Sequence, residues 1–290
     1  MTSPPSLTTD QILSYLTLEP ADRRDCVALL QGSPGPGAVV VLAALNERLG
    51  TASGEPPRLE VAETDWIEGF LRFTPELVQW HAELGIPDGV TRATLADVGR
   101  NLGLNRRVHG RFGLDTFRWL THHYAGSIFQ LGRLQYLMHQ GQDSPPEAAA
   151  GTGGIPGAAA GEWLLGIHIP ESGGLAPLAV QASLEQARPF FARYFPERPV
   201  RIADCASWLL DPYIPTHLDA DSNIVRFARR FTPYCRPIDA PTDAVYFTFR
   251  TRNMTDLAGL PRRTALQRMV LERIDDGGCW QLAYGYLPLP

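Results

Sequence analysis

The sequence predicts an α+β fold, in which a helical N-terminal domain is followed by a mixed β-sheet with flanking helices. In the N-terminal part, apolar residues recur every three or four positions, whereas strand-like and helix-like patterns alternate in the C-terminal part. Between the two parts, segment 141–161 is rich in Gly, Ala and Pro and nearly free of bulky apolar residues, which is typical of a linker. We therefore expect one domain over 1–140, ending in a strand, and a second domain over 162–290.

Helical periodicity dominates the first domain. It covers 9–50 with a break at the GSPGPG segment, and it resumes at Asp65. From there an apolar face extends to Trp80, which predicts a core helix. Pro75 lies within this stretch and should divide or kink it, because proline removes a backbone donor from the helix.

Segment 94–105 has a second interpretation. TLADVGRNLGLN has the cadence of a helix-turn-helix, with Gly103 at the turn and arginines after it. However, Gly110 and Gly113 disfavour a long recognition helix, and the net charge of −5 does not suit a protein that coats phosphates. DNA binding is therefore the minor alternative, and no nucleic-acid partner is predicted.

The first domain ends in a stretch, 127–139, whose aromatic and branched residues predict a strand. Gly132 would form a bulge or a point of close approach within it. A single strand would place alternate side chains on one face, namely Phe129, Leu131, Arg133, Gln135 and Leu137. If that face is buried, its two polar members need polar partners.

In the second domain, the period of the apolar residues predicts strands alternating with helices. The predicted strands are 162–170, 200–210, 243–250 and 279–289, and the predicted helices are 177–195 and 264–278. The strand 243–250 rests on the alternation in DAVYFTFR. Pro189 should bend the helix in which it lies.

Composition excludes several classes of protein. Hydrophobic residues make up 44% of the chain and charged residues 20%, and no apolar run approaches the roughly 20 residues of a membrane span. The N-terminus has no basic region before an apolar stretch, so we expect a cytoplasmic protein without a membrane partner. The four cysteines form no CxxC pair, and the acidic residues around Asp219 lack the glycine and the bidentate acid of a calcium loop. No metal is predicted.

Four segments, taken in order, resemble a known family. They are LGRLQY (131–136), IHIPESGGL (167–175), CASWLLDP (205–212) and SNIVRF (222–227). The chain resembles the actinobacterial acyltransferase domain-containing family, in which an N-acyltransferase N-terminal domain precedes a GNAT-like C-terminal domain. The resemblance implies transfer of an acyl group from acyl-CoA, as co-substrate, or an acyl thioester to an amine acceptor. Donor and acceptor would both be small molecules.

The residues at the end of the predicted strand 162–170 are candidates for catalysis. An amine must lose a proton to attack a thioester, so His168 or Glu171 is the candidate catalytic base. A hydrogen-bonded structural histidine and a capping carboxylate are the alternatives. In a second possible mechanism, the thiol of Cys205 would act as the nucleophile beside His168, and this is a minor possibility.

The turn that follows is the candidate cofactor site. Gly173 and Gly174 precede the helix 177–195, and backbone N–H groups at such a turn can hold an anion. The turn departs from the acetyl-CoA loop of ordinary GNAT enzymes, because the Arg/Gln-x-x-Gly-x-Gly/Ala pattern is missing at this place. A plain strand-to-helix turn is the alternative.

Polar and aromatic residues in the resembling segments are candidates for substrate binding. They are Arg133, Gln135, Ser207, Trp208, Ser222 and Asn223. Arg133 has the alternative of an ion pair with Glu171, and Ser222 and Asn223 have the alternative of capping a helix. The competing function is a non-catalytic small-molecule binding or regulatory module that has kept the fold and lost the cofactor loop. The sequence leaves the oligomeric state open.

Overall fold

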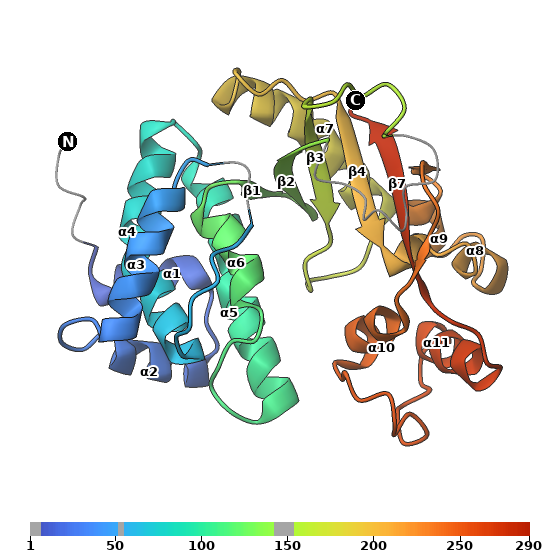
Figure 1. The fold of residues 1–290 in the computed structure, drawn as a ribbon, viewed down its shortest axis with the longest axis horizontal. Helices are drawn as coiled ribbons and strands as arrows, with labels where there is room; N and C mark the ends of the chain where they lie inside the picture. Colours follow the sequence, from blue (N-terminus) through green and yellow to red (C-terminus); the bar gives the residue numbers. More distant parts are fainter. Residues whose placement is uncertain (1–6, 52–54, 142–153) are drawn as a thin grey trace. The chain divides into compact units, whose positions relative to one another are not determined.

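The computed structural model describes residues 7–51, 55–141 and 154–290, which divide into two compact units (Figure 1). We call them the helical unit and the sheet unit. The helical unit comprises Met1–Met138, Ile169–Glu171 and Arg193–Pro196, and the sheet unit comprises His139–His168, Ser172–Ala192 and Glu197–Pro290. Most of the predicted linker falls on 142–153, outside the described residues.

Helices α1 to α6 make up most of the helical unit, as the sequence predicts. They are α1 (Thr9–Leu16), α2 (Pro20–Leu29), α3 (Pro36–Arg48), α4 (Glu63–Glu83), α5 (Asp88–His109) and α6 (Phe117–Tyr124). Local signals begin several of them. A capping box between Thr8 and Gln11 opens α1, and prolines occupy the first positions of α2 and α3.

The core of the helical unit is built on the predicted apolar face of α4. Trp66, Phe70 and Leu77 are fully buried there. Phe70 stacks on Tyr124 of α6, with 4.6 Å between the ring centroids. Gly69 lets α3 approach closely, because a Cβ at this position would lie only 2.3 Å from a methyl group of a valine in α3.

Two alternatives for the helical unit are decided by continuous helices. Pro75 lies inside an uninterrupted α4, so the segment is not divided there. Helix α5 continues through Gly103, so the minor helix-turn-helix interpretation fails for lack of a turn. A glycine inside a helix costs only about 1 kcal/mol, and burial of Leu95 and Leu102 on the same helix outweighs that cost.

The stretch predicted as a single strand is a hairpin. Strands β1 (Ile128–Leu131) and β2 (Leu134–Gln140) pair antiparallel, with Leu131 opposite Leu134. Gly132 has a φ of 65° and forms the turn, a conformation that favours glycine. The predicted common face is therefore wrong, because Arg133 lies in the turn and Gln135 lies on the second strand, opposite Gln130.

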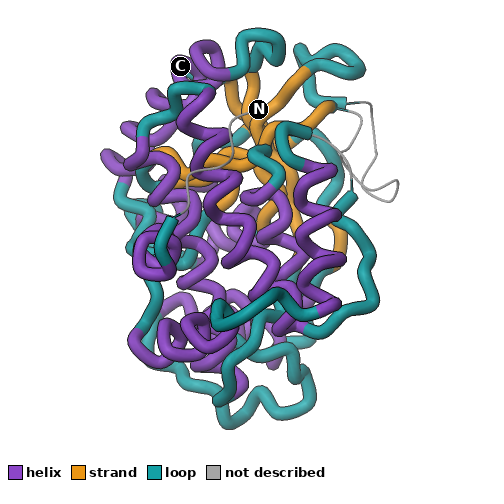
Figure 2. The backbone as a smooth tube through the Cα atoms, turned by 90° about the vertical axis from the view of Figure 1, so that its left-hand side faces the viewer, coloured by secondary structure: helices purple, strands orange, loops and turns teal. Residues whose placement is uncertain are grey.

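The sheet unit contains the end of β2 and a mixed sheet in the order β2-β3-β4-β7-β5, with β6 also paired to β7. The strands are β3 (Trp163–His168), β4 (Ile202–Ser207), β5 (Thr232–Pro233), β6 (Ile238–Asp239) and β7 (Gln281–Pro288). Strand β3 is parallel to β4, and β4 is antiparallel to β7. Figure 1 shows β3, β4 and β7 side by side, and the strands are orange in Figure 2. The predicted α+β fold is confirmed.

Helices flank this sheet, and the longest of them, α7, is the crossover between the parallel strands β3 and β4. The helices are α7 (Pro177–Tyr194), α8 (Ile214–His217), α9 (Asn223–Ala228), α10 (Pro241–Phe249) and α11 (Ala265–Asp275). Helices α7 and α11 confirm the sequence predictions, and α7 is continuous through Pro189. None of the described helices is long and apolar enough to cross a membrane.

Two predictions for the sheet unit are wrong. Residues 243–250 are not a strand, because α10 occupies them and buries Ala244, Val245 and Tyr246 consecutively, as a helix packed on more than one side does. Pro241 is the start signal for that helix. Strand β4 ends at Ser207, and a 3₁₀ turn, η1 (Trp208–Leu210), replaces the rest of the predicted strand.

Candidate active site

Polar side chains from two strands of the sheet unit meet over the strand that lies between them. His139 of β2 places Nε2 2.8 Å from Oδ1 of Asp204 in β4. The residue of β3 that pairs in register with Asp204 is Gly166. The hydroxyl of Tyr234 donates to the other oxygen of Asp204, at 3.4 Å. Burial raises the pKa of Tyr234, and the charge of Asp204 raises it further, so this hydroxyl stays a donor at neutral pH.

The predicted base His168 lies beside these polar side chains. It is the last residue of β3 and is half-buried. Because side chains alternate along a strand, His168 faces the same side of the sheet as Gly166. A Cβ on Gly166 would lie 3.4 Å from Nε2 of His168 and 3.5 Å from Cδ2 of His139, so both imidazoles fill the space over this glycine.

The predicted cofactor turn lies in the same unit, between β3 and α7. Gly173 has a φ of 62°, in the region that favours glycine. A Cβ on Gly173 or Gly174 would meet no heavy atom within 4 Å among the described residues beyond its chain neighbours. There is thus room beside the Cα atoms of both glycines, and the N-terminus of an 18-residue helix follows at Pro177. Such a turn favours a negatively charged ligand.

Arg230 brings a positive charge to the first turn of α7, which the sequence analysis did not identify. Its Nη1 donates to Oε1 of Gln181 at 2.6 Å, and its Nη2 lies 3.4 Å from the carbonyl of Pro177. The two contacts hold a guanidinium at the first turn of α7, the helix that follows the glycine turn. The link joins residues about fifty positions apart in sequence, so no local pattern could reveal it.

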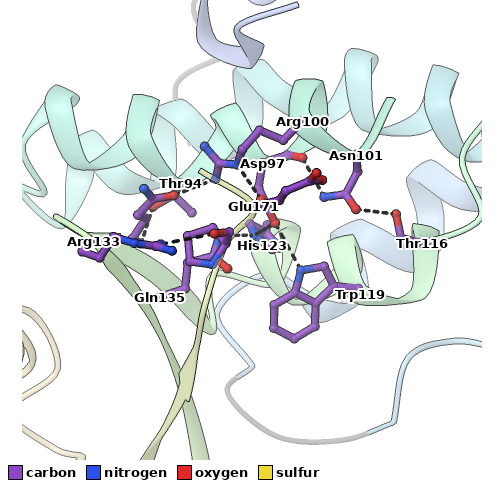
Figure 3. Close-up of polar contacts among 12 residues, drawn as sticks. Thr94, Asp97, Arg100, Asn101, Thr116, Trp119, His123, Arg133, Gln135 and Glu171 are labelled. Atoms are coloured by element: carbon purple, nitrogen blue, oxygen red, sulfur yellow. Dashed lines mark hydrogen bonds and ion pairs between the residues drawn. The ribbon is translucent and has the colours of Figure 1, made fainter. Parts of the chain in front are cut away.

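Asp97 is the centre of a buried polar cluster in the helical unit (Figure 3). Its Oδ1 accepts from Nε of Arg100 at 2.9 Å, and its Oδ2 accepts from Nε1 of Trp119 at 3.2 Å and lies 3.1 Å from Nε2 of His123. Burial alone would raise the pKa of Asp97. The hydrogen bond and charge of His123, with those of Arg100, outweigh burial and hold that pKa well below its usual range.

Three of the predicted site residues lie around this cluster. Gln135 is buried, with Nε2 3.4 Å from Nε2 of His123. Arg133 donates to the carbonyl of Pro170 at 3.2 Å, and burial, then repulsion by a second arginine, lowers its pKa. Glu171 accepts from Arg107 at 3.2 Å and is exposed. The segment Ile169–Glu171 is thus held within the helical unit, and it follows His168 directly in the sequence.

The remaining candidates have structural contacts in the sheet unit. Ser207 caps η1 through a backbone N–H two residues ahead, and Ser222 caps α9 through one three residues ahead, which confirms the capping alternative for Ser222. Trp208 is 5% exposed and packs edge-on against Trp280 in the core. Asn223 is the first residue of α9 and is exposed.

Cys205 is a poor candidate for a nucleophile. Its thiol is buried, and burial, with the charge of Asp204, raises its pKa far above the usual value, so the thiolate is disfavoured. Within the described part of the chain, no group of three or more His, Cys, Asp or Glu side chains is placed to hold a metal ion.

Two family profiles match the chain, one for each part. The profile of the N-acyltransferase N-terminal domain matches residues 8–126, and that of the GNAT-like C-terminal domain matches residues 128–287. No curated protein matches the chain.

Solved structures of acyltransferases are similar over essentially the whole chain. A mutant acyltransferase in complex with octanoyl-CoA is 30% identical, with a TM-score of 0.85, over 100% of this chain and 91% of the other. An acyltransferase in complex with CoA and 10C-teicoplanin is 31% identical, with a TM-score of 0.83, over 99% and 89%. A third, in complex with decanoyl-CoA, is 30% identical, with a TM-score of 0.82, over 99% and 92%. The chain therefore belongs to the GNAT-like acyltransferases that carry an N-acyltransferase N-terminal domain.

Proposed function

We propose that this chain is an N-acyltransferase that moves an acyl group from acyl-CoA to the amine of a small-molecule acceptor. The observation that carries the proposal is 30% identity, over the full chain, to acyltransferases in complex with octanoyl-CoA and decanoyl-CoA. A further similar structure holds 10C-teicoplanin. We therefore propose a donor of octanoyl to decanoyl length and a glycopeptide acceptor that bears a free amine.

The donor would bind at the glycine turn before α7. The absence of side chains at Gly173 and Gly174 would let the pyrophosphate of CoA approach this turn closely, and the dipole of α7 favours its negative charge. Arg230 adds the positive charge that neutral backbone groups lack, and charge-assisted hydrogen bonds to phosphate are strong. This arrangement would compensate for the missing GNAT loop pattern.

The reaction would be a direct attack. The amine nitrogen bonds to the thioester carbonyl carbon, the C–S bond breaks, and CoA leaves as a thiolate that then takes a proton. Strands β3 and β4 pair at Gly166 and Asp204, short of their ends at His168 and Ser207. A backbone N–H at these strand ends would polarise the thioester carbonyl and stabilise the negative charge on its oxygen.

His168 is the residue that we assign as the base. Its imidazole is half-buried at the end of β3, and a neutral imidazole can take the amine proton near neutral pH. Glu171 already accepts a hydrogen bond from Arg107, so we assign it to holding the segment between the base and the glycine turn. Arg133 holds the same segment through Pro170.

The test is acyl transfer by the purified protein from octanoyl-CoA to a glycopeptide with a free amine, followed by thiol release and by the mass of the product. His168→Ala should lower kcat by at least about 100-fold. The control is His217→Ala, because His217 is exposed and stacks on Tyr213 in the same unit. Absence of octanoyl-CoA binding would refute the proposal. Binding without turnover would instead support a non-catalytic module.

A further inference from the structure

The hydrogen bond between His139 and Asp204 spans an intervening strand. Strand β3 lies between β2 and β4, and neighbouring strands are about 4.8 Å apart, so the two residues belong to strands about 10 Å apart. Their side chains still meet, with Nε2 and Oδ1 2.8 Å apart. They meet over Gly166, which has no side chain to fill the gap. A larger residue there would separate them.

Asp204 needs this contact because it is buried. The residue is 5% exposed, and a buried carboxylate requires hydrogen-bond donors to offset the loss of water. His139 supplies one donor and the Tyr234 hydroxyl supplies another, one to each carboxylate oxygen. Because a carboxylate only accepts, Nε2 of His139 carries a proton in this contact. Nδ1 of the same ring lies 3.4 Å from the carbonyl of Gln140, and the two contacts fix the orientation of this imidazole.

The fixed imidazole of His139 and the imidazole of His168 both approach Gly166. Cδ2 of His139 and Nε2 of His168 lie 3.5 and 3.4 Å from the same point, the position that a Cβ on Gly166 would take. The two rings therefore border the same space over this glycine.

We propose that Asp204 and His139 are positioning residues for His168, and that Gly166 provides the space in which the two imidazoles meet. Asp204 orients His139, and His139 holds the His168 ring at the angle at which it reaches the acceptor amine. This proposal rests on the proposed function, because it assumes that His168 takes that proton. It adds a carboxylate, a second histidine and a glycine to the site.

The first arm of the test is Gly166→Val, and its control is His217→Ala, at an exposed histidine of the same unit, which should keep kcat within about twofold of wild type. A Cβ on residue 166 lies at ordinary contact distance, 3.4 to 3.5 Å from atoms of the two rings. The additional methyl groups of valine would occupy the positions of the imidazoles. Displacing a catalytic group by about 1 Å can lower the rate about 100-fold. In Gly166→Val, kcat should therefore fall by that factor, while KM for octanoyl-CoA should stay within about twofold of the wild-type value.

His139→Gln and Asp204→Asn provide the second arm. Each should lower kcat at least about tenfold without raising KM for octanoyl-CoA. In wild type, nitrogen NMR should show a proton on Nε2 of His139. Wild-type kcat in both variants, or in Gly166→Val, would overturn the positioning role. So would an Nε2 of His139 without a proton in wild type, a readout that does not depend on the folding of any variant. Absence of acyl transfer in wild type would refute the proposed function instead.

Discussion

Asp97 and His123 form a buried pair in the helical unit, with Oδ2 and Nε2 3.1 Å apart and the two side chains 5% and 0% exposed. Arg100 and Trp119 donate to the same carboxylate, so one acidic group satisfies three donors from two helices. Removing the carboxylate of Asp97 leaves these donors without this acceptor. The cost of such a loss is much larger than that of a surface ion pair.

Asp97→Asn should therefore destabilise the helical unit by about 3–5 kcal/mol. Urea unfolding followed by circular dichroism measures this change. Asp10→Asn is the control, because Asp10 pairs with Arg23 on the surface and is 86% exposed, so its loss should cost at most about 1 kcal/mol. Equal effects of the two substitutions would contradict the structural role of the cluster.

The burial of His81 should make the stability of the protein depend on pH. Burial lowers the pKa of His81 to about 3, whereas the ordinary value is 6.5. Between these values the unfolded chain binds the extra proton and the folded chain does not, so stability falls as the pH falls through that window. The contribution approaches about 1.4 kcal/mol per pH unit. His81→Asn can keep the hydrogen bond to Thr91 but cannot titrate. Its free energy of unfolding should vary less with pH between about 4.5 and 6.5, and an unchanged slope would show that His81 is not buried neutral.

Substitution of Arg230 tests the proposed binding site for the acyl-CoA donor. Arg230→Gln should raise KM for octanoyl-CoA about tenfold, since a charge-assisted hydrogen bond contributes about 1.5–3 kcal/mol and 1.4 kcal/mol is tenfold in affinity. Steady-state kinetics should show kcat nearly unchanged. Arg229→Gln is the matched control, because Arg229 is exposed and contacts the carbonyl of Ala220. If both variants behave like wild type, Arg230 does not bind the donor.

Substitutions of Arg133 test whether the segment between His168 and the glycine turn supports catalysis. Arg133→Met removes the hydrogen bond to the carbonyl of Pro170, and we expect kcat to fall about tenfold because His168 loses its downstream support. Arg133→Lys, which keeps a donor, should recover part of the activity. Arg118→Met removes only the longer contact to exposed Glu55 and should behave like wild type. Full activity of Arg133→Met would exclude this role.

The sequence was sufficient to predict the fold class and most long elements, because their signals are local. The apolar face of α4 and the glycine-terminated α11 both follow from periodicity. The hairpin β1–β2 was misread because Gly132 has the same local signature in a bulge as in a turn. Helix α10 was misread because VYFTF alternates like a strand, and the start signal of Pro241 was overlooked.

The site could be predicted only in part, for a physical reason. His168 and the glycine turn stand next to each other in sequence, so a local pattern indicated them. The partners His139 and Asp204 are separated by 65 positions, and only the sheet order brings them together. One local signal was available: Gly166 interrupts a strand of bulky apolar residues, and a lone glycine in a strand often marks the close approach of another group.

The most direct test of the proposed acyl transfer is a single turnover with octanoyl-CoA and a glycopeptide that carries a free amine, read by the mass of the acceptor. The proposed function predicts that the wild-type protein adds one octanoyl group to the amine and releases one CoA thiol, and that His168→Ala does neither at a comparable rate. Release of CoA without acylated acceptor, or equal acylation by His168→Ala, would contradict it.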